Sequence, residues 1–295
     1  MTDQATRLRQ MVGSEMNETP VLSTQQPAAW ANVRVIAVTS GKGGVGKTNL
    51  VVNLAIALRQ RGQRVLVIDA DLGMANVGIL LGTASRRNLL DLLQPEVNLD
   101  DVIVETPYGI QYISGGSGIE KAIEYDHAEK LLLQQKLADC AARADLIFVD
   151  TGAGLGRSVM DFILAADEVL LVTTPEPTSL TDAYAVMKAY SIYATQKNLH
   201  LIINRVYDTK ESHEVAFKLR RAAEKFLHMS VDSLGYVYED AAVTKAVRKQ
   251  MPLLKAFPHA AAARCVDALA ETLISGREMN VKSGWMGFLQ QFFKF

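Results

Sequence analysis

The sequence predicts an α/β fold, a mostly parallel twisted sheet with helices on both faces. Short apolar runs alternate with longer amphipathic stretches along the chain, as in a parallel sheet with crossover helices. The runs VLVID and LIFVD are almost continuously apolar, which strands covered on two faces require. Residues 13–32 are rich in Ser, Thr, Gln, Asn and Pro, so they are predicted to be a flexible linker. The globular part should begin near Val33.

Local patterns predict the elements in order. Six short runs are expected to be strands. Residues 49–60 and 178–195 have the spacing of helices, and right-handed crossovers would place such helices on both faces of the sheet. The 295 residues suffice for one large domain, predicted at 33–276, with additional segments at its ends. The predicted strands are residues 33–39, 64–68, 110–114, 145–149, 168–173 and 199–203.

Composition narrows the class of protein. Hydrophobic residues make up 49% of the chain and charged residues 21%, as in a soluble globular protein. The 31 basic and 32 acidic side chains nearly cancel, which argues against nonspecific nucleic-acid binding. The N-terminus has no apolar signal-peptide core, and no run reaches about 18 apolar residues. We therefore expect a cytoplasmic protein without a membrane span.

Cysteine and histidine chemistry is not indicated. Cys140 and Cys265 lie far apart and match no C-x-x-C or zinc spacing, so we interpret both as small buried hydrophobic residues. The five histidines fall in no metal or catalytic motif and are expected at the surface or at helix caps.

A phosphate-binding loop follows the first predicted strand. It satisfies G-x-x-x-x-G-K-[ST] between a strand and a helix, the context that this motif needs. Its glycines let backbone N–H groups surround phosphates, and the helix N-terminus adds a positive dipole end. Lys47 should reach the β- and γ-phosphates, and the Thr48 hydroxyl should ligate Mg²⁺. The predicted nucleotide-binding residues of the loop are Gly41, Lys42, Gly43, Gly44, Val45, Gly46, Lys47 and Thr48.

Three aspartates at strand ends complete the predicted phosphate site. Asp69 and Asp71 follow the second run, and Asp150 ends LIFVD, so all should lie at the carboxyl edge of the sheet. Asp150, in DTGAG, is predicted to orient a magnesium-bound water. We assign Asp69 to the metal, together with Thr48 and Asp150, and Asp71 to the attacking water.

The loop contains an additional lysine, Lys42, ahead of Lys47. It therefore reads K-G-G-x-G-K-T and resembles the MinD/ParA family of deviant Walker P-loop ATPases. The resemblance implies ATP and Mg²⁺ as cofactors, slow hydrolysis and an ATP-bound homodimer. In that dimer Lys42 would reach the partner's phosphates, so Lys42, Lys47, Asp71 and Asp150 are the implied catalytic residues. The alternative for Lys42 is a solvated loop lysine.

Further segments extend the resemblance over nearly the whole globular part. Residues 69–76 fit the family's D-x-D-x-x-x-x-N switch and residues 150–154 its second switch. Asn204 and Arg205 follow a strand where the family binds adenine, and the loop 236–240, with Tyr238, would flank the base. The turn TTPEP resembles the segment that borders the nucleotide and the dimer contact.

Within the family, DADLGMANVG, DTGAG and TTPEP resemble the FlhG branch, which controls flagellar placement and number. Residues 1–12 resemble the motif by which that branch activates the SRP-type GTPase FlhF. The resemblance thus implies FlhF as a partner, with flagellar switch or C-ring proteins as further partners. On composition alone, a short polar N-terminus is more often a frayed end. The motif residues are Asp3, Gln4, Ala5, Leu8 and Arg9.

The last residues, 277–295, predict an amphipathic helix. Five apolar side chains recur at positions i, i+3, i+4, i+7 and i+8 and form one stripe. With Lys282 and Lys294 nearby, the stripe suits reversible binding to an anionic membrane at the inner face of the cell. We hypothesise that it is buried in the monomer and released by ATP dimerisation; the alternative is a helix that only packs on its own domain. The stripe comprises Trp285, Phe288, Leu289, Phe292 and Phe293.

Other readings share the same phosphate site. A MinD-type ATPase that positions cell division would have the same chemistry and a similar tail, but it would be expected to start almost at the first strand. A ParA-type DNA-segregation ATPase would need a basic dimer surface, which the near-neutral charge argues against mildly. An iron protein of the nitrogenase type needs paired cysteines for its cluster, and Cys140 and Cys265 do not match.

Overall fold

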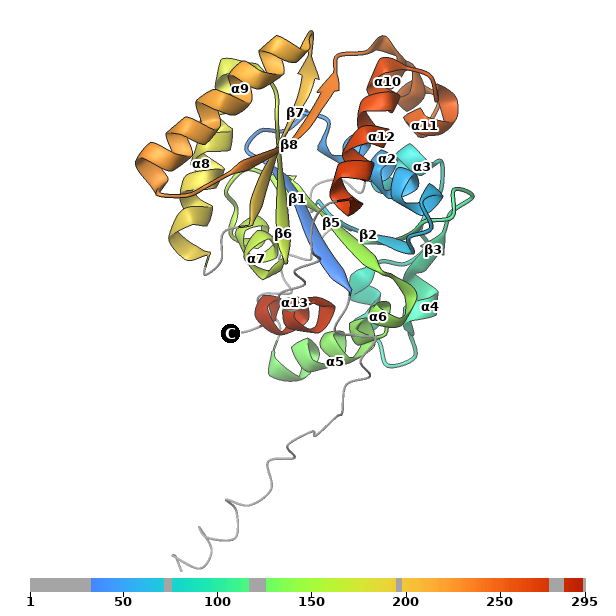
Figure 1. The fold of residues 1–295 in the computed structure, drawn as a ribbon. Helices are drawn as coiled ribbons and strands as arrows, with labels where there is room; N and C mark the ends of the chain where they lie inside the picture. The colour runs from blue at the N-terminus through green and yellow to red at the C-terminus, as the bar shows by residue number, and fades with distance from the viewer. Residues whose placement is uncertain (1–32, 72–75, 117–125, 195–197, 276–283, 294–295) are drawn as a thin grey trace, which may run out of the picture.

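The computed structural model describes residues 33–71, 76–116, 126–194, 198–275 and 284–293. Its strands form one sheet in the order β3-β4-β2-β5-β1-β6-β7-β8, which crosses the centre of Figure 1. All neighbours are parallel except β3 and β4. The predicted mostly parallel α/β fold is thus confirmed. The strands are β1 (Arg34–Ser40), β2 (Val65–Ala70), β3 (Ile103–Glu105), β4 (Gln111–Ser114), β5 (Leu146–Ala153), β6 (Glu168–Thr173), β7 (Leu199–Val206) and β8 (Asp232–Tyr238).

The six predicted strands are all present, with ends shifted by a few residues, but β3 and β8 were missed. β3 has only three residues, too few for a periodic pattern. β8 reads DSLGYVY, with polar residues at its start and Gly235 inside it. Gly235 has φ 149°, and a side chain there would collide with Leu269. This close approach explains why a glycine interrupts an edge strand.

Helices cover both faces of the sheet. One face carries α2, α3, α10, α11 and α12 around one apolar cluster, and Figure 1 shows α10 to α12 gathered beside α2. The other face carries α5, α6, α7 and α13 over one half and α8 and α9 over the other. The bounds are α2 Lys47–Gln60, α3 Val77–Leu81, α4 Leu99–Val102, α5 His127–Ala138, α6 Cys140–Arg143, α7 Arg157–Ala165, α8 Pro177–Tyr193, α9 Thr209–Ala222, α10 Ala241–Arg248, α11 Leu253–Ala256, α12 Ala261–Ile274 and α13 Gly284–Phe292, with short turns η2 Leu89–Leu93 and η4 Ala223–Leu227.

A buried ion pair closes the amino-terminal end of the sheet. The Arg34 guanidinium, on β1, donates two hydrogen bonds to the Glu168 carboxylate on β6, one of them 2.7 Å from Nη2 to Oε2. Its remaining nitrogen donates to the Leu273 carbonyl at the end of α12, at 2.8 Å. His200 lies beside the pair, with Nε2 3.9 Å from Glu168 Oε2. Both charges are therefore inside the protein with their hydrogen bonds made.

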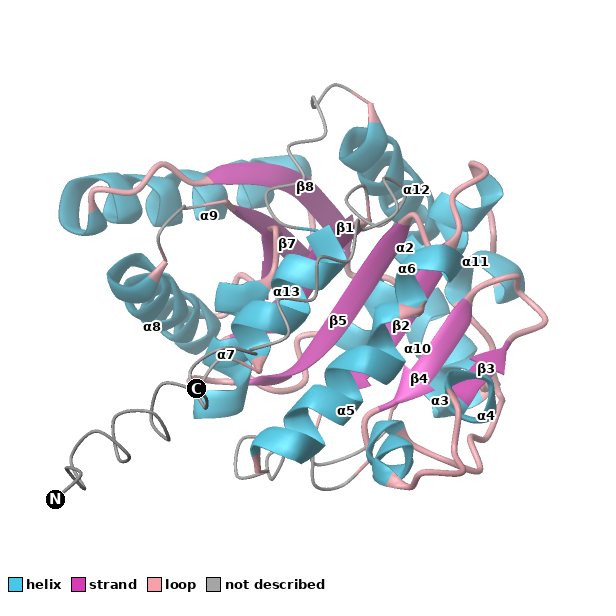
Figure 2. Cartoon of the chain, turned by 90° about the horizontal axis from the view of Figure 1, so that it is seen from below, coloured by secondary structure: helices cyan, strands magenta, loops and turns pink. Residues whose placement is uncertain are grey.

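The predicted aromatic stripe is buried against the domain. Figure 2 shows α13 lying between α5 and α7, and Trp285 is only 1% exposed. The Trp285 indole donates to the Leu137 carbonyl at 2.6 Å, and the Phe162 ring on α7 lies 4.4 Å from the Phe292 ring. The first amide of the helix, Gly284 N, donates to Asp167 Oδ1 at 3.2 Å. In space α13 belongs to the core of the domain, although residues 277–295 were predicted as a segment separate from it.

The two cysteines and one histidine differ in their surroundings. Cys140 is buried, and burial raises the pKa of its thiol to about 12. Cys265 is only half-buried, so the prediction of a buried residue is wrong for Cys265. His200 is buried rather than at the surface. Its ring lies next to Glu168 and forms a hydrogen bond with Asn198 at 2.9 Å.

Among the described residues, no helix is both long and apolar enough to span a bilayer.

Candidate nucleotide site

The phosphate-binding loop connects the carboxyl end of β1 to the start of α2. Gly44 and Gly46 have φ angles of 78° and 91°, values that only glycine adopts without strain. Gly41 lies against the backbone of α8, where a side-chain carbon would fall 2.3 Å from the Asp182 carbonyl carbon. These glycines are therefore required by the backbone, and the loop presents its amides at the positive end of a 14-residue helix.

Lys47 and Asp150 form a buried ion pair under this loop. The Lys47 ammonium lies 2.7 Å from Asp150 Oδ1, and both side chains are at most 7% exposed. Burial raises the pKa of Asp150, while the charge of Lys47 opposes this. Asp150 Oδ2 is buried without a hydrogen-bond partner among the described residues. The pair brings together two of the predicted catalytic residues, and one carboxylate oxygen still lacks a donor.

That unpaired oxygen fits the predicted magnesium site. A buried carboxylate oxygen without a donor is costly and would be satisfied by water bound to a cation. Thr48 follows Lys47 in the first turn of α2 and is close enough to lower the pKa of Asp150. Thr48 could therefore ligate the ion, with Asp150 orienting a water of its shell.

Asp69 is positioned differently from the prediction. Its Oδ1 accepts from the Asp71 amide at 3.3 Å and its Oδ2 from the Val77 amide at 3.0 Å. Burial, together with the nearby charges of Asp150 and Asp71, raises the pKa of Asp69 to about 7. Both oxygens of Asp69 accept hydrogen bonds from backbone amides. This arrangement fits a carboxylate that connects Asp71 to Val77 better than it fits a direct ligand of the metal.

Asp71 lies at the same edge, just beyond the end of β2. Because β2 ends at Ala70, strand alternation does not decide where Asp71 points. Its Oδ1 lies 3.8 Å from the position that a side-chain carbon on Gly152 would occupy. The Asp71 charge also raises the pKa values of Asp69 and Asp150, so the three carboxylates share one region. The structure therefore brings Asp71 beside the second predicted switch, as its assigned role needs.

Lys42 is held within its own chain. Its ammonium donates to Glu176 Oε2 at 3.0 Å and to Thr178 Oγ1 at 3.1 Å, at the start of α8. The hydrogen bond from Lys42 lowers the pKa of Glu176. The Lys42 side chain is 41% exposed. The predicted TTPEP turn thus lies beside Lys42.

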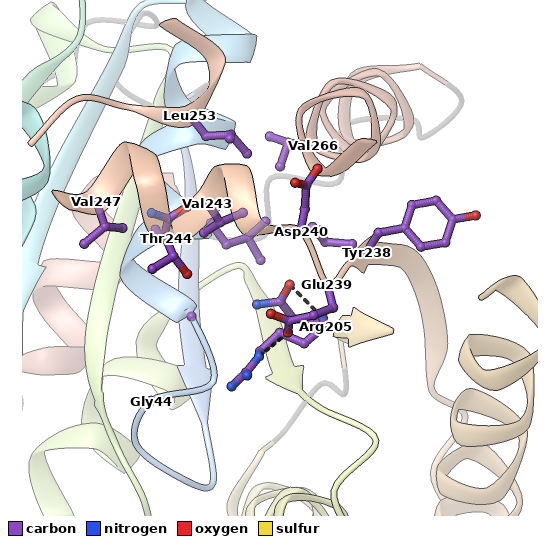
Figure 3. Close-up of a pocket in the computed structure, with 15 residues that line it drawn as sticks. Gly44, Arg205, Tyr238, Glu239, Asp240, Val243, Thr244, Val247, Leu253 and Val266 are labelled. Carbon is purple, nitrogen blue, oxygen red and sulfur yellow. Dashed lines mark hydrogen bonds and ion pairs between the residues drawn. The ribbon is translucent and has the colours of Figure 1, made fainter. Parts of the chain in front are cut away.

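A pocket of about 290 Å³ opens beside the loop. Figure 3 shows its walls, with Gly44 of the phosphate-binding loop on one side and Val243, Thr244 and Val247 of α10 on another. The sequence did not predict these walls, because most of their apolar side chains come from three short or moderate helices in the last third of the chain, with others from α2 and β8. Their weak signal was the apolar spacing within residues 241–248 and 261–274. The wall residues that were missed are Asn49, Leu50, Val237, Val243, Thr244, Val247, Leu253 and Val266.

The predicted base-binding residues reach this pocket in different ways. Asn204 donates from Nδ2 to the Val45 carbonyl at 2.6 Å, so its side chain supports the phosphate loop. Arg205 has a φ of 61° and donates from Nε to Glu239 Oε2 at 2.6 Å. Tyr238 lines the pocket, but its ring extends away from the other labelled side chains (Figure 3). Tyr238 therefore contributes backbone more than ring surface.

The chain resembles known proteins over most of its length. The family described as AAA domain matches residues 33–203. The antiactivator FleN of Pseudomonas aeruginosa is 40% identical over 82% of this chain and 87% of its own length. The flagellum site-determining protein YlxH of Helicobacter pylori is 35% identical over 90% of this chain and 91% of its own. The septum site-determining protein MinD of Pyrococcus horikoshii, solved with Mg-ADP, is 28% identical over 82% of this chain and 96% of its own, with a TM-score of 0.65.

These similarities agree with the geometry of the loop, its second lysine and its strand-end carboxylates. The family predicted from the sequence is therefore confirmed. The chain belongs to the MinD/ParA family of P-loop ATPases, and it resembles the FleN and YlxH flagellar proteins of that family.

Proposed function

We propose that this ATPase regulates flagellar placement and number through an ATP-dependent homodimer. The observation that carries the proposal is the 40% identity to the antiactivator FleN over 82% of the chain. A second relative is a flagellum site-determining protein that matches 90% of the chain. The FlhG branch, which the sequence predicted, includes proteins named FleN and proteins named YlxH. ATP hydrolysis would then serve as a timer for assembly and not as a source of mechanical work.

The geometry supports Mg-ATP hydrolysis with these roles. The loop amides and Lys47 would bind the phosphates, and the pocket beside Asn204 would hold the base. Mg²⁺, ligated by Thr48, would neutralise phosphate charge and carry ordered water. Asp150 would orient that water through its unpaired oxygen, with Asp69 holding the adjacent loop. Asp71 would position the attacking water.

Lys42 is proposed to act across the dimer. In the monomer its ammonium is bound by Glu176 and Thr178, both exchangeable surface partners. Insertion at the partner's phosphates would replace these bonds with a stronger charge interaction. Lys42 would thus link hydrolysis to dimerisation.

The dimer and the role of Asp71 can be tested together. Asp71→Ala keeps the binding groups and removes the carboxylate assigned to the water, so it should accumulate an ATP-bound dimer. Size-exclusion chromatography with light scattering, in ATP and Mg²⁺, would detect it. Lys42→Ala in the same background is the control, because it should restore the monomer. An Asp71→Ala chain that stays monomeric with ATP would contradict the mechanism.

We propose that α13 is a releasable membrane anchor, placing the ATP-bound dimer peripherally on the inner face of the cell membrane. Its apolar side is covered in the monomer by α5 and α7, which explains how a stripe of four aromatics and a leucine avoids aggregation. Removing residues 281–295 should abolish ATP-dependent sedimentation with anionic liposomes. Unchanged sedimentation would reject the anchor.

FlhF is the proposed partner of residues 1–12. Asp3, Gln4, Ala5, Leu8 and Arg9, which carry this prediction, lie outside the described residues, as does the predicted linker 13–32. A pull-down with and without residues 1–12 separates the candidate functions. Loss of the GTPase with the truncation supports the flagellar function, and the C-ring proteins can be assayed in parallel. Capture of division proteins by both forms would favour the MinD-type alternative, which the similarity to the septum protein keeps open.

A further inference from the structure

Two helices that wall the nucleotide pocket begin without a capping residue of their own. α12 follows Ala260 and α11 follows Pro252, and neither residue provides a side-chain hydrogen bond to the helix that it precedes. The first amides of a helix need acceptors, and alanine and proline side chains have none to offer. For both helices, a residue distant in sequence supplies the acceptor.

Asp240 supplies the acceptor for α12. Its Oδ1 accepts from the Ala242 amide at 2.8 Å, inside α10, and its Oδ2 accepts from the Ala262 amide at 3.1 Å, in the first turn of α12. One carboxylate therefore caps two helices at once. Figure 3 shows this carboxylate pointing toward the part of the pocket where Val266 lies.

The charge of Asp240 suits this position. The hydrogen bond from Ala242, followed by those from Ala262 and Ala261, lowers the pKa of Asp240. The carboxylate is thus ionised at neutral pH, at the positive ends of two helices. Replacing it by an amide removes the charge and leaves a single acceptor oxygen for two N–H donors.

Asn53 plays the same part for α11. Its Oδ1 accepts from the Leu254 amide at 3.0 Å, and its Nδ2 donates to the Asn49 carbonyl at 2.8 Å. Asn53 is buried within α2, the helix that starts at the phosphate loop. It therefore fixes the position of α11 relative to that loop.

The two caps set the distances between the pocket walls. Val243 and Val247 come from α10, Leu253 from α11 and Val266 from α12, and these apolar side chains face the same space. We propose that Asp240 and Asn53 are positioning residues that fix the width of the base pocket, and so set adenine-nucleotide affinity without acting on the phosphates. This inference rests on the proposed placement of the base in this pocket.

Calorimetry on the full chain tests the proposal with two probes, Mg-ADP and Mg-tripolyphosphate. Tripolyphosphate needs only the loop, whereas ADP also needs the pocket. Asp240→Asn should raise the Kd for Mg-ADP about tenfold or more, because one of two charge-assisted bonds is lost. Its Kd for Mg-tripolyphosphate should change less than about twofold. In hydrolysis assays KM for ATP should rise while kcat changes little. Asn53→Ala should likewise raise the Kd for Mg-ADP more than the Kd for Mg-tripolyphosphate.

Asp208→Asn is the matched control. Asp208 Oδ1 caps α9 alone, through the Glu211 amide at 2.8 Å, and asparagine caps a single helix nearly as well as aspartate. This variant should bind both probes as the wild type does. The proposal is overturned if Asp240→Asn binds Mg-ADP normally, or loses affinity for both probes by the same factor. A wild-type chain that binds tripolyphosphate but gains nothing from the adenosine moiety of Mg-ADP would instead remove the base pocket from the proposed function.

Discussion

The two ends of the central sheet both bury charged side chains, but only one end leaves them incomplete. At the amino-terminal end, Arg34 and Glu168 neutralise each other through two hydrogen bonds, and the Leu273 carbonyl takes a further donor. At the carboxyl end, Asp150 has Lys47 on one oxygen and no hydrogen-bond partner among the described residues on the other. Similar chemistry thus serves architecture at one end and a binding site at the other.

The difference shows how a buried carboxylate marks function in this fold. When the charges of a buried pair cancel and all its hydrogen bonds are made, no polar atom of the pair is left to bind a ligand. In the cluster of Asp69, Asp71 and Asp150, burial first and then the charges of Asp150 and Asp71 raise the pKa of Asp69 to about 7, so mutual repulsion remains. Such repulsion favours a cation and its water, so the unsatisfied end is where Mg-nucleotide fits.

The largest expected effect is at the complete end. Glu168→Gln removes the charge that neutralises buried Arg34 and should lower the free energy of unfolding by about 3–5 kcal/mol. Urea unfolding of both chains without nucleotide measures this difference in the free energy of unfolding. Asp145→Asn, which breaks the exposed pair with Arg64, is the control and should cost about 1 kcal/mol or less. Equal losses in the two variants would contradict the contrast between buried and exposed pairs.

At the incomplete end, Asp150→Asn should act on both catalysis and stability. The amide can still accept from Lys47, but it orients metal-bound water poorly, so kcat/KM should fall about 10- to 100-fold. Steady-state hydrolysis at several magnesium concentrations is the measurement. The nucleotide-free variant should also unfold more easily, because the buried Lys47 ammonium loses its partner charge, but less so than Glu168→Gln, because the Asp69 and Asp71 carboxylates share the region. A chain that hydrolyses ATP normally would remove Asp150 from the site.

The raised pKa of Asp69 predicts a smaller, pH-dependent effect. Between pH 4 and 7 the folded protein holds this proton more tightly than the unfolded chain, whose aspartate pKa is about 3.9. Stability contributed by the protonated group is therefore lost as the pH rises, by about 2 kcal/mol between pH 5 and 7. Urea unfolding of nucleotide-free wild type against Asp69→Asn isolates this slope. If the difference between them is flat with pH, Asp69 titrates normally.

The smallest effect concerns the helix that lies at the complete end. Trp285→Phe keeps an aromatic ring but loses part of the buried indole and its hydrogen bond to the Leu137 carbonyl, which alone is worth about 1 kcal/mol. Docking of α13 should weaken about fivefold, so sedimentation with anionic liposomes without ATP should increase. Gln290→Ala, on the exposed side of α13, is the matched control. If both variants behave like the wild type, the indole bond does not help hold α13 in place.

Much of the phosphate site could be predicted, because it is built from contiguous residues. Gly41 to Thr48 form a loop whose glycines and lysine have one arrangement compatible with a strand before and a helix after. Asp69 and Asp150 end apolar runs, so parallel pairing of β2 with β5 brought them to one edge, with Asp71 just beyond the end of β2. For both the loop and the aspartates, the local sequence determined the position along the chain, and formation of the parallel sheet then brought them together.

The base pocket could not be derived in this way. Asn204 and Tyr238 were predicted at the base, but the structure uses the Asn204 amide to hold the phosphate loop and turns the Tyr238 ring away. The walls from α10, α11 and α12 meet through hydrogen bonds between residues as far as 201 positions apart. Periodicity within one segment contains no information about such pairings.

By itself, then, the sequence determined the family, the positions of most strands along the chain, the phosphate loop and the aromatic stripe of α13, because each is encoded in consecutive or regularly spaced residues. Tertiary structure decided that Asp69 binds backbone, that Lys42 is held by Glu176, and that the stripe lies buried between α5 and α7. The physical reason is that burial and hydrogen-bond partners depend on which distant surfaces meet. Those contacts exist only once the sheet has brought the surfaces together.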